Sequence, residues 1–233
     1  MWLWVGGIAV AIVVVGSLLY WLLIITEGLF LGRRMVVWLY DRTAHQYDGI
    51  KEFDALAEQF FVTQPLLLQL TGIPAPRVLD VATGTGRLPY FLLNEPLFNG
   101  KVVGAEPSAK MLALAQEKLR PFSYRVSLVQ QTAVPLPFAD HSFDAVTCLE
   151  ALEFFPSDRE ALQEMVRVLR PGGTLLVTRR RGWEAKLFLG RYWSQEAFAA
   201  YLRSLGLEGV DTQIWQVDYD QVFARKPIVG SRE

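Results

Sequence analysis

Residues 77–89 constrain the fold of this chain more than any other stretch, because they read as an apolar strand, a glycine turn and the start of a helix. The apolar residues of Val78–Val81 are typical of a strand that is buried on both faces. The following Thr83–Gly86 lets the backbone turn sharply and approach a ligand, since glycine accepts a positive φ. Pro89 fits the first turn of the next helix. This pattern also suits an ordinary strand–helix turn, but in an open α/β sheet it marks the place where nucleotide-like ligands bind.

A second short apolar strand, residues 101–106, ends on the carboxylate of Glu106. This acid follows Gly84 at close to the ~20-residue offset at which nucleotide-binding units place a carboxylate on the ribose hydroxyls. We therefore expect Glu106 to bind a ribose. The glycine spacing then separates two cofactor classes. A dinucleotide fingerprint, G-x-G-x-x-G/A, requires a small residue where Pro89 stands, which counts against NAD.

The stretch resembles motif I of the class I S-adenosylmethionine-dependent methyltransferases, in which an acid precedes the glycine loop as Asp80 does here. This resemblance implies that Asp80 orients the loop and approaches the methionine amino group, while the loop backbone packs on the cofactor. Ala82 stands at the usual first glycine, and Val81–Gly86 is similar to the loop of the quinone-biosynthesis C-methyltransferases. Arg87 departs from that subgroup, which usually has a small polar or acidic residue there, so the placement of the loop stays open.

A second stretch, Gln131–Val146, closely resembles the family segment that reads the adenine edge. The resemblance assigns this contact to Thr132 and to the backbone N–H of Ala133. Thr132 replaces the usual Asp, so the first contact would pass to its hydroxyl or to backbone alone. Leu149, after the next strand, is expected to pack near the cofactor. The resemblance thus implies S-adenosyl-L-methionine as the cofactor and these binding residues: Asp80, Ala82, Thr83, Gly84, Thr85, Gly86, Glu106, Pro107, Thr132, Ala133 and Leu149.

Glu150 and Tyr47 are the candidates for catalysis. Glu150 follows the fourth expected strand, where an open sheet presents its active site, but it reads equally as an acid at a helix start. Tyr47 lies in Tyr40–Asp48, which resembles the lid segment that precedes motif I in many small-molecule methyltransferases; ordinary helix packing explains it as well. His45 is a further candidate base, although a lone histidine is more often a surface residue. With two histidines and one cysteine the sequence predicts no metal site, and Cys148 reads as inert packing.

Residues 2–26 carry no charged side chain, and this run exceeds the ~20 residues that a spanning helix needs. We expect a single transmembrane helix whose Trp and Tyr residues resemble the aromatic belts of the two membrane interfaces. A cleaved signal peptide is the competing interpretation, but a basic start and a cleavage site are missing. Arg33, Arg34 and Arg42 follow the run, so the positive-inside rule predicts that the domain after it is cytoplasmic.

Four further segments have a predicted form. Gly28–Tyr40 reads either as an interfacial helix whose arginines snorkel to lipid head groups or as a linker helix with a core-facing stripe. Ile50–Leu70 predicts one or two amphipathic helices, broken near Pro65. Arg179–Arg181 predicts a solvated cluster or a patch that holds anionic lipid. Trp183–Trp193 is an aromatic, partly basic insertion that suits covering a substrate or touching the bilayer.

The sequence thus predicts an α/β fold: a Rossmann-like, seven-stranded, mostly parallel methyltransferase sheet with helices on both faces and a reversed strand at one edge. The expected domains are a membrane anchor at 1–27, juxtamembrane and cap helices at 28–71, and a cofactor-binding domain at 72–233. The implied function is membrane-anchored methyl transfer to a small lipophilic acceptor, such as a quinone precursor or a lipid. A non-catalytic membrane-tethered cofactor-binding protein and an NAD-linked oxidoreductase are the alternatives. A net charge of −1 argues against a nucleic-acid partner.

Overall fold

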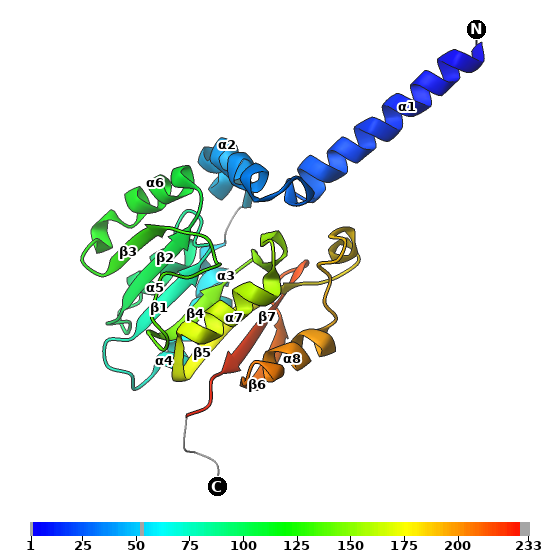
Figure 1. The fold of residues 1–233 in the computed structure, drawn as a ribbon. Helices are drawn as coiled ribbons and strands as arrows, with labels where there is room; N and C mark the ends of the chain where they lie inside the picture. Colours follow the sequence, from blue (N-terminus) through cyan, green and yellow to red (C-terminus); the bar gives the residue numbers. More distant parts are fainter. Residues whose placement is uncertain (1, 52–53, 229–233) are drawn as a thin grey trace.

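The computed structural model of this protein describes residues 2–51 and 54–228. Its centre is a seven-stranded sheet in the order β3-β2-β1-β4-β5-β7-β6 (Figure 1). Strands β1 to β5 pair in parallel, whereas β7 is antiparallel to both β5 and β6. The predicted sheet is confirmed, except that the reversed strand lies next to the edge rather than at it. The strands are β1 (Arg77–Val81), β2 (Lys101–Glu106), β3 (Val126–Gln130), β4 (Phe143–Cys148), β5 (Leu169–Arg180), β6 (Glu208–Ile214) and β7 (Tyr219–Arg225).

Helices cover both faces of this sheet and bury its apolar side chains. One face packs against α4, α5 and α6, so that Leu66, Leu92 and Ala115 join one apolar cluster with Val78. The other face packs against α7 and α8, which contribute Leu162 and Phe198, among others, to a second cluster. The helices of these two layers are α4 (Gln64–Leu70), α5 (Arg87–Asn94), α6 (Ala109–Lys118), α7 (Asp158–Val168) and α8 (Gln195–Ser204).

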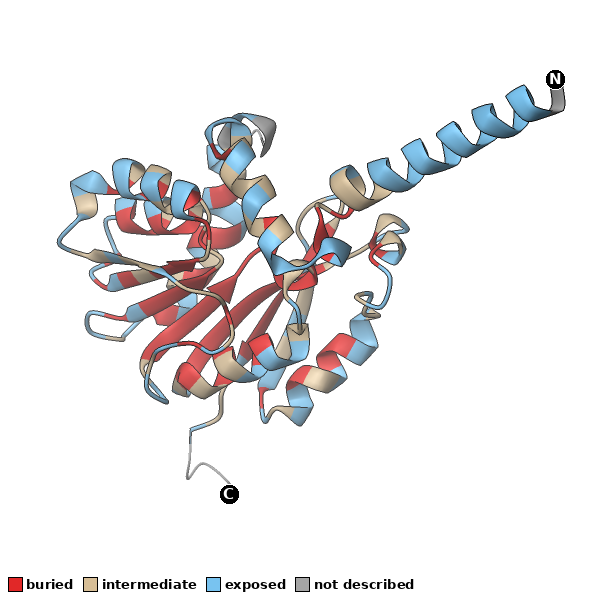
Figure 2. Cartoon of the chain, turned by 45° about the horizontal axis from the view of Figure 1, so that its top comes forward, coloured by how far each residue is buried: buried red, intermediate tan, exposed pale blue. Residues whose placement is uncertain are grey.

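Strand β4 is buried throughout, and β1 is buried from Val78 onward, as continuous apolar runs predict for a parallel sheet. Figure 2 shows this buried layer between helices whose outer faces are exposed. Cys148 at the end of β4 is fully buried, and burial raises the pKa of its thiol well above the usual range. The interpretation of Cys148 as inert packing is therefore consistent with its surroundings. Short 3-10 turns follow three of the elements: η4 (Arg120–Phe122), η5 (Leu152–Phe154) and η6 (Glu184–Leu187).

The N-terminal helix α1 (Trp2–Tyr20) projects away from the body, and its residues are exposed wherever their burial is described (Figures 1 and 2). With the π-helical turn η1 (Trp21–Ile25) it forms a stretch, Trp4–Ile25, of 22 residues with a mean hydropathy of 2.8, long and apolar enough to cross a membrane. Its base touches the body through Trp21, whose indole N–H donates to the carbonyl of Leu187 at 3.2 Å.

The segment between α1 and the sheet differs from the prediction in two places. The helix expected over Gly28–Tyr40 is divided: a 3-10 turn, η2 (Leu29–Leu31), ends at Gly32, and α2 (Arg33–Lys51) begins after it. The expected break near Pro65 is a change of helical pitch instead. α3 (Ala55–Glu58), the π turn η3 (Gln59–Thr63) and α4 follow one another, with Pro65 in the first turn of α4. A wider turn accommodates a residue that has no N–H to donate.

Arg179 and Arg180, which end β5, and Arg181, which follows them, are paired with acids, so neither interpretation of them as a solvated or lipid-binding cluster is correct. The antiparallel register places Arg179 directly opposite Asp220 of β7, and the two form a buried ion pair. Arg181 contacts the same carboxylate at 3.2 Å. Arg180 pairs with Glu153 of η5, also at 3.2 Å. The acids come from segments that are distant in sequence, so the run of arginines by itself did not indicate that they are paired.

Candidate functional site

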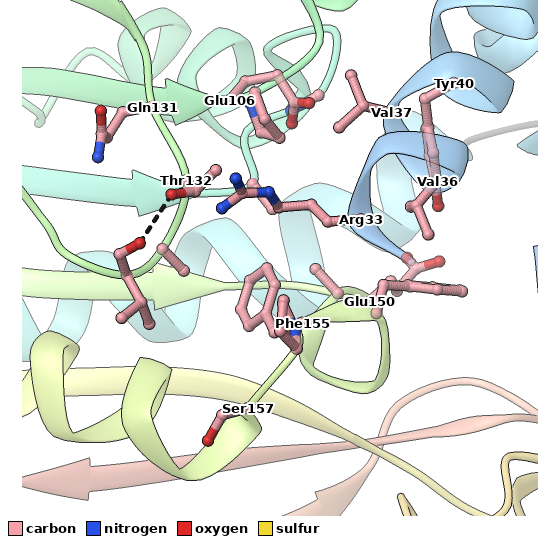
Figure 3. A pocket seen from close by; sticks show the side chains of 18 of the residues that line it. Arg33, Val36, Val37, Tyr40, Glu106, Gln131, Thr132, Glu150, Phe155 and Ser157 are labelled. Atoms are coloured by element: carbon pink, nitrogen blue, oxygen red, sulfur yellow. Dashed lines mark hydrogen bonds between the residues drawn. The ribbon is translucent and has the colours of Figure 1, made fainter. Parts of the chain in front are cut away.

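Two adjoining cavities lie at the carboxyl ends of the parallel strands, where open α/β sheets bind their ligands. The larger, of about 310 Å³, is drawn in Figure 3. The smaller, of about 30 Å³, lies along the glycine loop. Four residues line both cavities: Tyr47, Ala82, Gly84 and Leu149. Every predicted cofactor-binding residue except Gly86 lines one cavity or the other.

Asp80 holds the glycine loop to the sheet. Its two carboxylate oxygens accept hydrogen bonds from the hydroxyls of Thr83 and Thr147, each at 2.6 Å. Burial raises the pKa of Asp80 to about 6, and these two hydrogen bonds oppose the rise. Ala82 has a φ of 58°, a left-handed conformation that explains why the family usually has glycine there. Gly84 has a φ of 55° and no atom within 4 Å of where a Cβ would stand, so its backbone is open to a ligand.

Gly86 serves a different purpose from the other loop glycines. A Cβ at this position would lie 2.8 Å from a methyl group of Leu119 and 3.2 Å from the Cβ of Ala115. The glycine therefore lets α5 start close to α6. Its role in packing is evident from the structure, whereas its predicted contact with the cofactor is a proposal that its surroundings do not favour.

Glu106 is a buried carboxylate placed to receive hydroxyl groups. One oxygen accepts from the N–H of Gly84 at 3.1 Å and the other from the N–H of Ser108 at 2.9 Å. Burial raises the pKa of Glu106 to about 7, against the effect of these two N–H groups. Each carboxylate oxygen has lone pairs for a second donor. This pair of acceptor oxygens fits two vicinal hydroxyls, such as those of a ribose, that donate to it.

Thr132 and Ala133 also line the larger cavity. The Thr132 hydroxyl donates to the carbonyl of Val134 at 2.9 Å, the dashed line in Figure 3. The hydroxyl oxygen keeps lone pairs that can accept a further hydrogen bond. One neutral oxygen can thus receive an amino group where the family usually offers a carboxylate. A neutral acceptor makes a weaker hydrogen bond than a charged one.

Helix α2 covers the larger cavity from outside the sheet. Arg33, Val36, Val37 and Tyr40 line it, and Figure 3 shows the Arg33 side chain extending from α2 across the opening toward Thr132. These positions recur at helical spacing on one face, so periodicity identifies the inner face of α2. This matches the expected core-facing stripe. Arg33, whose snorkelling to lipid was one of the two interpretations of this segment, lines the cavity, a position that the sequence pattern did not indicate.

A hydrogen-bonded contact fixes α2 over the cavity. The carboxylate of Asp41 accepts from the Ser108 hydroxyl at 2.5 Å and from the N–H of Lys110 at 3.2 Å. Ser108 also caps α6, since its hydroxyl accepts from the N–H of Met111 at 3.1 Å. Asp41 therefore joins the cover to the first turn of α6, directly after Glu106 and Pro107.

Arg87, the residue that departs from the related loops, forms a buried ionic group beside the glycine loop. Its guanidinium lies 2.9 Å from the carboxylate of Glu150 and 3.5 Å from that of Glu58. The guanidinium also lies over the ring of Trp215, 5.5 Å from its centroid, which is within the range of a cation–π contact. No sequence pattern indicates this group, because its members come from α3, α5, the end of β4 and the turn before β7.

The three candidate bases differ in position. Glu150 lines the larger cavity and has a φ of 53°, so it is not the first residue of a helix. A left-handed, non-glycine residue at a strand end is the kind of strain found at functional sites. Tyr47 lines both cavities, and burial, followed by the nearby charge of Glu150, raises the pKa of its phenol above the usual range. Tyr47 is thus a hydrogen-bond donor at neutral pH. His45 is exposed and does not line either cavity.

Residues 79–177 match the protein family described as "Methyltransferase domain". The demethylmenaquinone methyltransferase of Thermus thermophilus is 43% identical over 101 residues, which make up 43% of this chain and 46% of that protein. The chain spans about half the length of the curated relatives it matches.

Two solved structures show the same fold. An S-adenosylmethionine-dependent methyltransferase from Clostridium acetobutylicum has a TM-score of 0.65 and 16% identity, covering 81% of this chain and 99% of that one. The cyclase SpnF has a TM-score of 0.62 and 22% identity, covering 72% of this chain and 80% of that one. At these identities the likeness describes the fold alone.

Proposed function

Since this chain belongs to the class I S-adenosylmethionine-dependent methyltransferases, we propose that it transfers a methyl group to a small lipophilic acceptor at a membrane. The proposal rests on the side chains that line the larger cavity. Polar groups expected to bind the cofactor, Glu106 and Thr132 among them, share this cavity with an apolar wall. The wall consists of Val36, Val37, Leu149, Ala151, Phe154, Phe155 and Pro156.

The residues present fit the predicted cofactor. Glu106 would accept the ribose hydroxyls, and the Thr132 oxygen would accept the adenine amino group. Asp80, while holding Thr83 and Thr147, adds a carboxylate beside the loop that favours an ammonium group. S-adenosylmethionine, when bound, supplies an electrophilic methyl group on a sulfonium. The chain's own contribution is to align and enclose the reactants, and alignment can supply much of the acceleration of a displacement.

The acceptor is proposed from the apolar wall and from the relatives. Phenylalanine and valine side chains favour an aromatic or isoprenoid group, and the Thermus thermophilus relative is named for a demethylated menaquinone. A quinone precursor in its reduced form would lose a proton from the ring system as the new carbon–carbon bond forms. We propose that the Glu150 carboxylate, held by Arg87, receives that proton, while the Tyr47 phenol donates a hydrogen bond to an acceptor oxygen.

Transfer of a tritiated methyl group tests this proposal in the full chain reconstituted in lipid nanodiscs. The acceptor is a demethylated naphthoquinol with a short isoprenoid tail, and the readout is radioactivity in the organic phase. We expect turnover in the unchanged chain. Glu150→Gln should lower kcat by about 10²- to 10⁴-fold, the usual contribution of general-base catalysis, and leave S-adenosylhomocysteine affinity within about twofold. Transfer that is undiminished in this variant would remove Glu150 from the mechanism.

One alternative retains specific support. Thr132 replaces the usual acid, and the fold neighbour SpnF is named as a cyclase, so this fold is not restricted to proteins that are named as methyltransferases. Tight binding of S-adenosylhomocysteine, with no label in the organic phase from either the quinol or a total membrane-lipid extract, would favour this alternative. The NAD-linked alternative has lost its support, because the matched family and Pro89 both argue against it.

A further inference from the structure

Exposed apolar side chains gather at the base of α1, on two segments that are far apart in sequence. One segment follows α1 and continues into α2, and the other is the insertion between β5 and α8. We call this set the apolar collar. It consists of Ile24, Phe30, Leu31 and Trp38 on the first segment and Trp183, Leu189 and Tyr192 on the second. Isolated exposed apolar residues need no explanation, but a contiguous group marks an interaction surface.

Two contacts through Trp21 make the collar one surface with α1. The Trp21 indole N–H donates to the carbonyl of Leu187, and its ring stacks on Phe30 with centroids 4.9 Å apart. In Figure 1 the golden-brown loop of the insertion lies beside the end of α1 that meets the body. The apolar surface of Trp4–Ile25 thus continues directly onto the body.

The collar also borders the cover of the larger cavity. Phe188 of the insertion packs edge-on against Phe154, with centroids 5.9 Å apart, and Phe154 packs against Tyr40 of α2 at 6.3 Å. Phe154 and Tyr40 line the cavity. The amino ends of the strands, where the loop containing Leu97 lies, are at the opposite end of the sheet.

We propose that the collar is a membrane-docking surface, so that the body rests on the bilayer interface with the larger cavity beside the lipid. Tryptophan and tyrosine are the side chains that favour this interface, and three of the seven collar residues are of these types. Exposed Arg34 and Lys186 adjoin the two segments and suit anionic head groups. A lipophilic acceptor, which rests on the proposed function, would then reach the cavity without crossing water.

A bilayer fits the collar better than a second copy of the chain does. The collar is continuous with a helix of 22 residues that is long and apolar enough to span a membrane. A spanning helix fixes the collar at the depth where the chain leaves the hydrocarbon. The collar residues would therefore meet head groups and the outer acyl region, because the first segment continues from that helix and the second is joined to its base by the contact of Trp21 with Leu187.

Nitroxide labels on single cysteines in the full chain test the proposal. Leu189→Cys and Trp183→Cys report on the collar, where the native side chains are 61% and 70% exposed. Leu97→Cys is the matched control, because Leu97 is also apolar, is 85% exposed and lies at the far end of the sheet. Cys148 is buried and should not react. The chain is reconstituted in vesicles of phosphatidylcholine and phosphatidylglycerol, and collision rates with oxygen and with a water-soluble nickel complex are compared.

We expect both collar labels to collide preferentially with oxygen, which concentrates in lipid, and the Leu97→Cys label to collide preferentially with the nickel complex. Collar labels as accessible to nickel as the control would overturn the proposal. So would spin–spin broadening of the collar labels that disappears on dilution with unlabelled chain, because a second copy would then cover the collar. Titration with S-adenosylhomocysteine distinguishes the two failures: a variant that docks on lipid but binds no cofactor contradicts the proposed function and leaves the docking surface intact.

Discussion

The glycine loop does not account for an arginine at position 87, but the residues around its guanidinium do. Two buried carboxylates, Glu58 and Glu150, face its guanidinium. Burial raises the pKa of Glu58, and the charge of Arg87 opposes that rise. A small residue, as in the related loops, would leave the two acids without this cation. Arg87 in the loop and Glu58 in α3 are therefore two parts of the same ionic group.

Removing Arg87 should destabilise the protein strongly. We expect Arg87→Ala to lower the free energy of unfolding by about 3–5 kcal/mol, because it leaves buried carboxylates uncompensated. Chemical denaturation of the chain in nanodiscs measures the change. Adding Glu150→Gln to Arg87→Ala should recover part of the loss, since it removes one of the two charges. A single variant as stable as the unchanged chain would contradict the ionic account of this group.

The raised pKa of Glu106 predicts a pH dependence of cofactor binding. Hydroxyl donors favour the carboxylate form, so binding must release the proton that Glu106 holds below its pKa of about 7. S-adenosylhomocysteine should therefore bind more tightly as the pH rises from 6 to 8, and affinity should level off above that range. Glu106→Gln should abolish most of this dependence and weaken binding by about 10- to 100-fold, the equivalent of about 1.5–3 kcal/mol for hydrogen bonds to a charged group. Calorimetric titration across this pH range measures both effects.

At the scale of elements, helix α2 covers the carboxyl ends of the strands and so encloses the site. Its inner face lines the larger cavity, and Asp41 ties it to the first turn of α6. The segment approaches the site from the N-terminal side, whereas the glycine loop and the strand ends form the floor. Opening of α2 is the simplest route by which ligands would exchange.

Loosening the contact of α2 with α6 should therefore speed release of the ligand. We expect Asp41→Ala to raise the dissociation rate of S-adenosylhomocysteine by about 5- to 30-fold, which corresponds to the loss of about 1–2 kcal/mol of hydrogen bonding. Stopped-flow displacement measures the rate. His45→Ala is the matched control, because His45 is an exposed residue of the same helix. Equal rates in the two variants would mean that α2 does not gate the site through Asp41.

Sequence patterns predicted the elements better than the contacts between them. The strands and the glycine loop were predictable because local burial and turn geometry determine them, as in Val78–Val81 and Gly84. The pairing of Arg179 with Asp220 was not, because it depends on the register between β5 and β7. The same holds for Arg87, whose partners lie 29 and 63 positions away along the chain. Long-range ionic contacts leave no periodic signal in one sequence.

At the scale of the whole molecule, α1 meets the body at the carboxyl end of the parallel strands (Figure 1), and the residues that line the larger cavity lie at the same end. If α1 spans a membrane, Arg33, Arg34 and Arg42 favour a cytoplasmic body by the positive-inside rule. This arrangement would bring a site with an apolar wall to the source of lipophilic acceptors. The choice of acceptor depends on a cofactor site that functions, whereas membrane docking is tested separately from it.

Calorimetric titration of the full chain in nanodiscs with S-adenosylhomocysteine and, separately, with NADH tests that site most directly. Asp80→Ala and Glu106→Ala serve as the site variants, and Leu97→Ala serves as a control at the far end of the sheet. The account predicts that S-adenosylhomocysteine binds, that both site variants weaken it by at least tenfold, and that NADH does not compete. Binding of NADH in preference, or S-adenosylhomocysteine affinity that is unchanged in both site variants, would contradict the assignment of the cofactor to these two cavities.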